Sequence, residues 1–186
     1  ERPFIKLLEE EEDLAVHVLV DASESMVWPA GDPATQKLAY AARLAAAVAH
    51  IALAAGDMLS VVLLQQSETR TWGPSRGAHH SLRLFQFLET AERDTHGRIQ
   101  LNDMLRDYAL RGRRPGLLLL LTDLLTPTGY REGLNALLGR GYEVAVLHIL
   151  SPDELDPPLL GDVKLVDSET GAEAEMTLDA STVAEY

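Results

Sequence analysis

The sequence predicts a single α/β domain with a doubly wound, mostly parallel central sheet and helices on both faces. Short segments rich in Val and Leu alternate with longer segments of helical periodicity, which is the pattern of strands joined by crossover helices. The strand-like segments are almost continuously apolar, as expected for strands that are covered on both sides. At 186 residues and 46% hydrophobic composition, the chain has the size and apolar content of one such domain.

Four segments have the composition of buried strands. Each is a short apolar run bounded by turn-forming or charged residues, and together they cover residues 14–20, 57–64, 117–121 and 143–150. Residues 68–72 are more polar and precede Gly73-Pro74, which predicts a short antiparallel edge strand that ends there.

The helical segments lie between these strands. The longest covers residues 38–55, which are rich in alanine, carry larger apolar residues at three- and four-residue steps, and stop at Gly56. Asp32-Pro33 could supply the N-cap and the first residue of this helix. Three further apolar stripes predict helices over residues 81–91, 101–108 and 130–138.

The C-terminal part predicts smaller elements. Ser151-Pro-Asp-Glu154 has the form of a capping box with proline at the first helical position, so a single helical turn is expected. Two strand-like runs, 163–166 and 172–178, flank Glu169-Thr-Gly171 and predict a hairpin. We therefore expect one domain over residues 1–186, with its core at about 13–150 and an extension at 151–186.

Composition excludes several classes of function. Twenty-nine acidic against 16 basic residues give a formal net charge of −13, which argues against nucleic-acid and anionic-membrane partners. The chain has no cysteine, which suits a reducing compartment, and we expect a cytoplasmic location. The longest apolar run, residues 44–55, is shorter than a membrane span of about 20 residues. Because the chain opens on Glu1, we expect a piece of a longer polypeptide, which leaves a membrane anchor outside this segment open.

Oxygen-bearing side chains follow two of the predicted strands at the points where those strands end. Asp21, Ser23 and Ser25 come directly after the first strand, and Asp123 closes the leucine run at residues 117–121. In a doubly wound sheet, ligands gather beyond the carboxyl ends of strands, where the winding reverses. Carboxylate and hydroxyl oxygens at alternate positions of a tight loop are hard ligands of the kind that Mg²⁺ prefers. These four residues are therefore candidate metal ligands; the alternative is that they cap turns and bind backbone amides.

The segment around Asp21 resembles the metal-ion-dependent adhesion site of von Willebrand factor type A domains. The likeness is closer to a bacterial subgroup, the domain of unknown function 58 family, and extends from about Asp13 to Gly171. It also rests on Lys37-Leu-Ala-Tyr-Ala-Ala-Arg-Leu, on Leu121-Thr-Asp-Leu124 and on the tail Leu165-Val-Asp-Ser-Glu-Thr-Gly171.

This resemblance implies a von Willebrand factor A-like fold without enzymatic activity. It also implies a protein partner, since members of the family are commonly encoded beside MoxR-type AAA+ ATPases, and a role in ATPase-coupled complex assembly or metal insertion. It also implies a site for Mg²⁺ at Asp21, Ser23, Ser25 and Asp123. The alternatives are that Mn²⁺ or Ca²⁺ takes its place or that the site holds no metal.

One position departs from the family pattern. Where the family offers a threonine ahead of the third helix, this chain has Ile99, which has no oxygen to give. Thr95 or Asp103 could compensate if the loop is rearranged, and Glu24 could reach the ion or crowd it. An incomplete set of ligands predicts weak Mg²⁺ binding.

The histidines have simpler explanations than metal binding. His79 and His80 are adjacent, so their side chains point apart, and no third ligand is spaced to join them. His17 and His148 fall in strand patterns, where we expect them to be satisfied within the core or on the sheet surface. His96 is the histidine nearest to the proposed site along the chain.

We therefore expect a non-catalytic protein–protein interaction module that docks at the carboxyl edge of the sheet, either bridged by Mg²⁺ or metal-free. One alternative is a metal-free scaffold whose site decayed when Ile99 replaced the hydroxyl. Another, of a different class, is a metal-dependent phosphohydrolase that uses Asp21 as its nucleophile. No Gly-x-Ser-x-Gly elbow and no phosphate-binding glycine loop accompany Asp21 in the sequence.

Overall fold

The computed structural model describes residues 14–31, 33–66, 68–91, 95, 97–111, 114–156, 161–166 and 173–178. The strands of the central sheet are β1 (Ala15–Asp21), β2 (Met58–Leu64), β3 (Thr69–Ser75), β4 (Leu117–Thr122) and β5 (Glu143–His148). The helices are α1 (Lys37–Ala55), α2 (Ser81–Leu88), α3 (Leu101–Leu110), α4 (Arg131–Gly139) and the one-turn α5 (Pro152–Leu155). Two further strands, β6 (Gly161–Val166) and β7 (Glu173–Leu178), form a separate hairpin.

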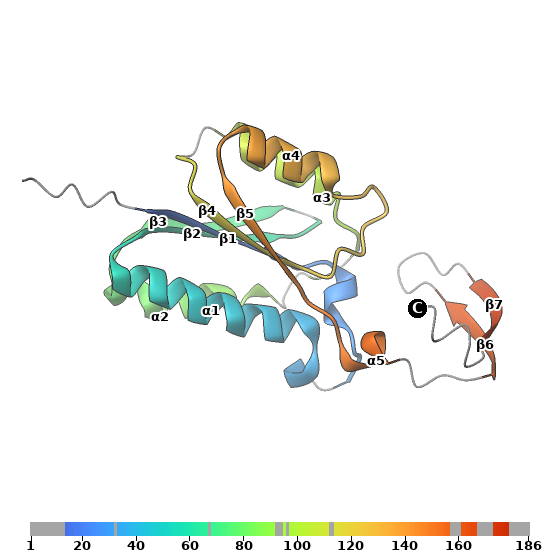
Figure 1. The fold of residues 1–186 in the computed structure, drawn as a ribbon. Helices are drawn as coiled ribbons and strands as arrows, with labels where there is room; N and C mark the ends of the chain where they lie inside the picture. The colour runs from blue at the N-terminus through green and yellow to red at the C-terminus, as the bar shows by residue number, and fades with distance from the viewer. Residues whose placement is uncertain are drawn as a thin grey trace, which may run out of the picture.

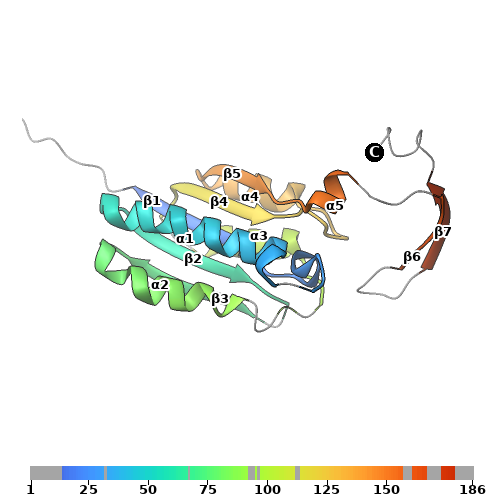
Figure 2. The same ribbon diagram turned by 90° about the horizontal axis from the view of Figure 1, so that it is seen from below.

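The central sheet has the strand order β3-β2-β1-β4-β5 (Figure 1). β1 pairs in parallel with β2 and β4, β4 pairs in parallel with β5, and β3 runs antiparallel at one edge. Helices α1 and α2 cover one face of the sheet, and α3 and α4 cover the other (Figures 1 and 2). The predicted doubly wound α/β class, with its antiparallel edge strand, is confirmed.

The winding of the chain reverses between β1 and β4. From β1 the chain builds outward to β2 and β3, and after α3 it returns to the other side of β1 to form β4 and β5. β1 and β4 are parallel neighbours, with Val20 paired to Leu121 near their carboxyl ends. These ends therefore lie together at the place where doubly wound sheets bind their ligands.

Alternate residues of β1 build the two halves of the core, and the whole strand is buried. Val16, Val18 and Val20 pack with α1 and α2, where the small residues of α1 allow the helix to approach the sheet closely. Leu19 packs on the opposite face with Leu105 of α3. Because side chains alternate along a strand, Asp21 is directed to the same face as Leu19.

The edge strand β3 differs from the sequence expectation. It does not end at Gly73-Pro74 but continues through this pair to Ser75. An edge strand tolerates proline because the missing N–H is not required by a second neighbour. Gly73 has a φ of 88°, and a Cβ there would lie 2.5 Å from the carbonyl oxygen of Leu59, so glycine permits the close strand contact.

Two helix boundaries and the burial of one strand also differ from the prediction. α1 begins at Lys37 with Gln36 as its N-cap, whereas Pro33 belongs to a separate 3₁₀ turn and Asp32 lies outside the described residues. α2 ends at Leu88 rather than at residue 91. β5 was expected to be buried, but it is the last strand of the sheet and is partly exposed because no strand covers its outer edge in the described part of the chain.

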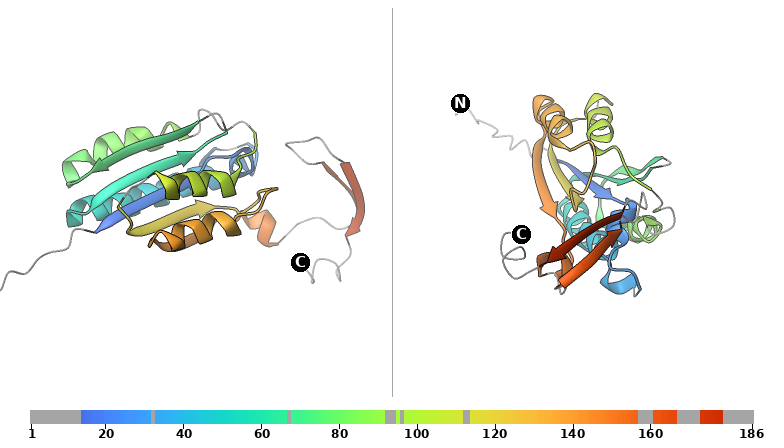
Figure 3. Two further views of the ribbon diagram at one scale, coloured as in Figure 1. Left: turned by 90° about the horizontal axis from the view of Figure 1, so that it is seen from above. Right: turned by 90° about the vertical axis from the view of Figure 1, so that its right-hand side faces the viewer.

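The predicted elements of the extension are confirmed. Ser151 and Glu154 form the capping box of α5: the Ser151 N–H donates to Glu154 Oε2 over 2.7 Å, and the Glu154 N–H donates to Ser151 Oγ over 3.3 Å. β6 and β7 pair antiparallel, and Lys164 Nζ lies 2.7 Å from Glu173 Oε2 across the hairpin. The hairpin lies beyond α5, on the side toward which the parallel strands point (Figure 3).

By length and composition alone, α1 is the one helix in the described part of the chain that could cross a membrane. It has 19 residues, so it is longer than the apolar run that the sequence analysis considered. A core helix of an α/β domain passes the same test, and α1 buries Leu38, Ala45 and Leu53 in the core on one face of the sheet. Packing against the sheet therefore accounts for its apolar face.

Candidate functional site

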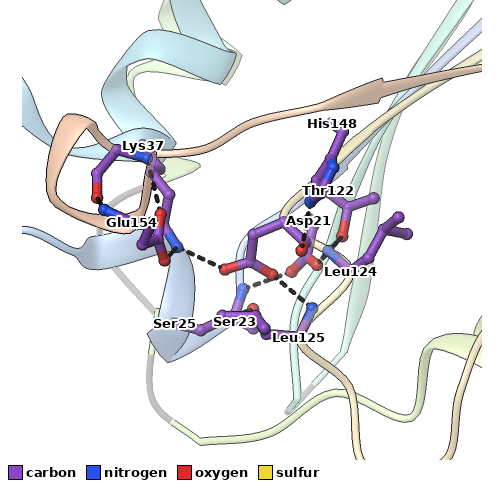
Figure 4. A network of polar contacts seen from close by, with 11 residues as sticks. Asp21, Ser23, Ser25, Lys37, Thr122, Leu124, Leu125, His148 and Glu154 are labelled. Carbon is purple, nitrogen blue, oxygen red and sulfur yellow. Dashed lines mark hydrogen bonds and ion pairs between the residues drawn. The ribbon is translucent and has the colours of Figure 1, made fainter. Parts of the chain in front are cut away.

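Two aspartates lie side by side at the carboxyl edge of the sheet. Asp21 is the last residue of β1, and Asp123 follows Thr122, the last residue of β4. Both are almost fully buried, with 3% and 2% of their surface exposed. The parallel pairing of β1 with β4 brings them together across about a hundred residues of sequence, as the contact between Thr122 and Asp21 shows (Figure 4).

Both carboxylate oxygens of Asp21 accept hydrogen bonds. The Ser23 N–H donates to Oδ1 over 3.0 Å, and the Thr122 hydroxyl donates to Oδ2 over 2.6 Å. Burial raises the pKa of Asp21 from 3.8 to about 6, because a desolvated carboxylate is less stable than the neutral acid. The hydrogen bonds from Thr122 and Ser23 oppose this shift, and the negative charge of Asp123 adds to it.

The loop after β1 turns its two serines toward each other. Residues Glu24–Val27 form a 3₁₀ turn directly after Ser23, which is buried, while Ser25 is partly exposed. The hydroxyl oxygens of Ser23 and Ser25 lie 3.1 Å apart. The four residues predicted as metal ligands thus lie at one edge of the sheet. Asp21 ends β1, Ser23 and Ser25 lie in the loop that follows it (Figure 4), and Asp123 follows the neighbouring strand.

Asp123 binds a lysine that the sequence analysis did not place in the site. Lys37, the first residue of α1, donates from Nζ to Asp123 Oδ2 over 2.9 Å, and the Leu125 N–H donates to Oδ1 over 3.0 Å. The Asp123 carbonyl oxygen accepts from His148 Nε2 over 3.0 Å. His148 is therefore an exposed residue that supports the site, not a core histidine.

The same lysine joins the site to α5. Lys37 Nζ donates to Glu154 Oε1 over 2.6 Å, and the other oxygen of Glu154 closes the capping box with Ser151. The side chain of Lys37 is only 1% exposed, that of Asp123 is fully buried, and that of Glu154 is 19% exposed. One buried ammonium is therefore held between two carboxylates, one inside the domain and one near its surface (Figure 4).

These contacts do not fit a divalent cation at the predicted ligands. The Lys37 ammonium already supplies positive charge 2.9 Å from Asp123, where a metal ion would be repelled. Each oxygen of Asp21 and Asp123 accepts a hydrogen bond from the protein.

The auxiliary ligands considered from the sequence are engaged elsewhere or stand apart from this network. Glu24 Oε2 accepts from the Gly97 N–H over 3.1 Å, which ties the two loops together. Asp103 is 70% exposed at its side chain and lies 4.0 Å from Arg106, so it faces solvent. Thr95 is partly buried, and the contacts described for the network do not include it.

Ile99 is part of the hydrophobic core. It is 3% exposed and packs in the cluster that contains Leu19, Leu101 and Leu105. The position at which the family resemblance implies a threonine ligand is thus filled by core packing between the sheet and α3.

His17 is structural, as expected, whereas the prediction that the His79 and His80 side chains point apart is wrong, since their ring centroids lie 4.1 Å apart. His17 is buried, with Nδ1 2.8 Å from the Tyr108 hydroxyl and Nε2 donating to the Arg114 carbonyl over 3.0 Å. His79 is exposed in a 3₁₀ turn before α2. The structure does not describe His96.

Three residues linked to the polar network through the backbone have large, exposed apolar side chains. Trp28 is 47% exposed, Leu125 is 61% exposed and Leu155 is 68% exposed. Each is tied to the network by its backbone or its position: the Trp28 carbonyl accepts from the Lys37 N–H, the Leu125 N–H donates to Asp123, and Leu155 follows Glu154. We call Trp28, Leu125 and Leu155 the apolar rim.

The sheet order and the site at the carboxyl ends of β1 and β4 define an α/β domain of the von Willebrand factor A-like type. The chain matches the model of the family described as "Protein of unknown function DUF58" over residues 1–186, and it belongs to that family. The predicted membership and fold are therefore confirmed.

The sequence relatives are mycobacterial. The chain is 27% identical over 180 residues to an uncharacterized protein of Mycobacterium tuberculosis, a match that covers 95% of this chain and 55% of the relative. It is 38% identical over 68 residues to an uncharacterized protein of Mycobacterium avium, covering 37% of this chain and 40% of the relative. The chain thus spans about half the length of the curated relatives it matches.

Two solved structures share the fold. An aerotolerance-related membrane protein from Bacteroides fragilis aligns with a TM-score of 0.58 and 19% identity, over 92% of this chain and 85% of the other. The manganese-loaded TRAP protein of Plasmodium vivax aligns with a TM-score of 0.50 and 22% identity, over 74% and 57%. At these identities the likeness establishes the architecture alone.

Proposed function

We propose that this chain is a non-catalytic protein-interaction module that docks a partner at the carboxyl edge of its sheet. The observation that carries the proposal is the apolar rim: Trp28, Leu125 and Leu155 are exposed, and their backbone is linked to a buried and internally satisfied polar network. Large apolar side chains that gather around a satisfied polar centre have the composition of a protein interface core.

The energetics of burying the rim favour the docking of a partner at this edge of the sheet. Burying the rim removes apolar surface from water, which is favourable by about 25 cal/mol per Å². The charges beneath it already bind one another, so a partner need not desolvate an unpaired ion in order to cover them. Trp28 is of the residue type that most often carries the binding energy of an interface.

The partner that we propose is a MoxR-type AAA+ ATPase. Support for this comes from membership of the family, whose members are commonly encoded beside such ATPases. We further propose a cytoplasmic location and a role in ATPase-coupled assembly or metal insertion. The surface of a large oligomeric ATPase can cover the rim, which extends over the β1–α1 loop, the β4–α4 loop and α5.

We favour the metal-free form of this module over the form bridged by Mg²⁺, Mn²⁺ or Ca²⁺. Lys37 supplies a positive charge beside Asp123, and Ile99 offers no ligand from the third loop. The phosphohydrolase alternative is less well supported, because both oxygens of Asp21 are bonded and its side chain is buried away from any substrate.

The experiment is a binding measurement with the purified MoxR-type ATPase of the same organism, immobilised and titrated with this chain. We expect the double variant Trp28→Ala and Leu125→Ala to weaken binding by at least about tenfold, because the interface loses two central apolar side chains. Leu110→Ala is the matched control, since Leu110 is 74% exposed at the end of α3 and at the opposite edge of the sheet. Equal affinities of the rim and control variants would overturn the proposed docking surface.

A further inference from the structure

Lys37 supplies a positive charge beside Asp123, one of the four residues at which the family resemblance implies a bound cation. Its Nζ lies 2.9 Å from Asp123 Oδ2 and 2.6 Å from Glu154 Oε1, and its side chain is 1% exposed. It is also the first residue of α1, so the positive end of the longest helix in the described chain adds to its charge. The site therefore holds Asp123 and Glu154 together without an ion from solution.

The two carboxylates that bind Lys37 are held differently. Asp123 is fully buried, is fixed by the Leu125 N–H and lies at the end of a central strand. Glu154 is 19% exposed and lies on α5, a single helical turn that follows an edge strand. Asp123 is thus the permanent partner of Lys37, whereas Glu154 closes the site from the outside.

Removal of Glu154 would open a path from the surface to the ammonium. An incoming carboxylate could then make the same short, charge-assisted hydrogen bond to Nζ, with little net change in the bonding of Lys37. Glu154 would exchange this bond for hydration at the surface. Two exposed residues of the apolar rim are directly linked to these carboxylates, since Leu155 follows Glu154 and the Leu125 N–H donates to Asp123.

From this geometry we infer that Lys37 is a built-in cation in a carboxylate-binding site. Glu154 is its internal ligand, and an aspartate or glutamate side chain of the docked partner replaces it. The inference rests on the proposed docking function and specifies the chemistry of the partner. It commits to a protein carboxylate; capture of a free small carboxylate is the alternative that the experiments below distinguish.

The first experiment uses acetate as the probe and requires no protein partner. We expect Glu154→Ala to lower Tm and acetate to restore about 2–4 °C of it in a saturable manner, compared with chloride at equal ionic strength. Glu132→Ala is the matched control, since Glu132 is 76% exposed and faces Arg106 across 3.9 Å on the surface. Absence of any rescue beyond that control would overturn the carboxylate site.

A second measurement shows whether acetate acts at Lys37. The chain has three lysines, so lysine side-chain methylene signals in NMR can be assigned with Lys6→Arg and Lys164→Arg variants. In Glu154→Ala we expect acetate to shift the Lys37 signals and to leave those of Lys6 and Lys164 unchanged. Equal shifts at all three lysines would mean that acetate acts through bulk solvent, which would refute the site.

The third experiment measures the affinity of Glu154→Gln for the MoxR-type ATPase. The single amide oxygen of glutamine can still accept from the Ser151 N–H, which turns its NH₂ group, a donor, toward Lys37 and removes the competing charge. We therefore expect about five- to tenfold tighter binding, with Glu132→Gln unchanged. If the rim variants weaken binding and Glu154→Gln does not strengthen it, the inference of a partner carboxylate is wrong, whereas the proposed docking surface is supported. If acetate rescues but the ATPase binds no variant, the site takes small carboxylates and the proposed partner is wrong.

Discussion

Two buried polar clusters lie on the same face of β1, at its two ends, and they differ in what they contact. At the amino end, His17 binds the Tyr108 hydroxyl and a backbone carbonyl, and its ring packs edge-on against Tyr108 and Tyr142. At the carboxyl end, Asp21 begins a network that continues through Thr122 and Asp123 to charged groups and then to the surface.

The difference teaches which buried polar groups point to function. The described partners of His17 are aromatic side chains and a carbonyl, so its contacts resemble ordinary core packing. The network of Asp21 contains ionisable groups in close contact and ends at a partly exposed carboxylate on a short helix. The candidate site is marked by a buried polar network that reaches the surface next to the apolar rim, and not by burial alone.

The largest expected effect tests whether the cluster at the carboxyl end of β1 contributes more to the free energy of unfolding than the cluster at its amino end. Lys37→Met leaves two carboxylates without their cation, and we expect it to lower the free energy of unfolding by about 3–5 kcal/mol. His17→Phe should cost about 1–3 kcal/mol, because it leaves hydrogen-bonding groups unsatisfied without stranding a charge. Urea denaturation measures both. The exposed pair of Lys164 with Glu173 supplies the control Lys164→Met, for which we expect less than about 1 kcal/mol.

A second prediction concerns pH. The folded-state pKa of Asp21, about 6, lies above its unfolded value of 3.8, so the folded protein binds the proton more tightly. The resulting stability is fully present below the unfolded pKa and is lost as pH rises through about 6, a total of about 3 kcal/mol. Asp21→Asn should remove this contribution, so that the difference between variant and wild type in the free energy of unfolding changes over this pH range.

The control for the pH prediction is Asp103→Asn, since the Asp103 side chain is 70% exposed. Its pH profile should parallel that of the wild type in urea denaturation. A parallel profile for Asp21→Asn as well would mean that the carboxyl-end cluster does not carry the pH dependence and is no more pH-sensitive than the surface.

A smaller effect tests whether Ile99 belongs to the apolar core and not to the carboxyl-end cluster. Ile99→Thr places a hydroxyl among leucines and should cost about 1–3 kcal/mol without creating Mn²⁺ affinity. Ile99→Val is the control for lost volume, at about 0.5–1.5 kcal/mol. Thermal stabilisation of Ile99→Thr by Mn²⁺ would contradict this and would show that the loop can supply a metal ligand.

The smallest effect is local. Ser151→Ala removes half of the capping box and should cost about 1 kcal/mol, with faster hydrogen exchange of the amides in α5. Amides of β1 around His17 should be unaffected. Faster exchange at both ends of β1 would mean that the two clusters are coupled through the strand.

The sequence predicted the fold well because its signals are local. The alternation of apolar runs with helical stripes predicted the sheet, and Ser151-Pro-Asp-Glu154 predicted α5 from spacing alone. Two expectations failed because they depended on neighbours along the sheet: β5 is partly exposed because it is an edge strand, and β3 continues through Gly73-Pro74 because it is one too.

The site was predicted in part, for a similar reason. Asp21 and Asp123 follow strands, and the rule for doubly wound sheets places both at one edge. Lys37 and Glu154 were missed because they meet across 117 residues of sequence, and a lysine at the start of a helix has no pattern that distinguishes it from a surface residue. Ile99 was recognised as a missing ligand, but only the packing shows that it is part of the core.

One consequence follows from the attachment of the Lys37 ammonium to the polypeptide. A bound ion can be removed by dialysis or by a chelator, and its occupancy changes with the concentration of free ion in the cell. A lysine side chain is present in every copy of the protein as soon as the fold forms. A domain that holds its partner through Lys37 would therefore bind with the same strength whether divalent ions are scarce or abundant.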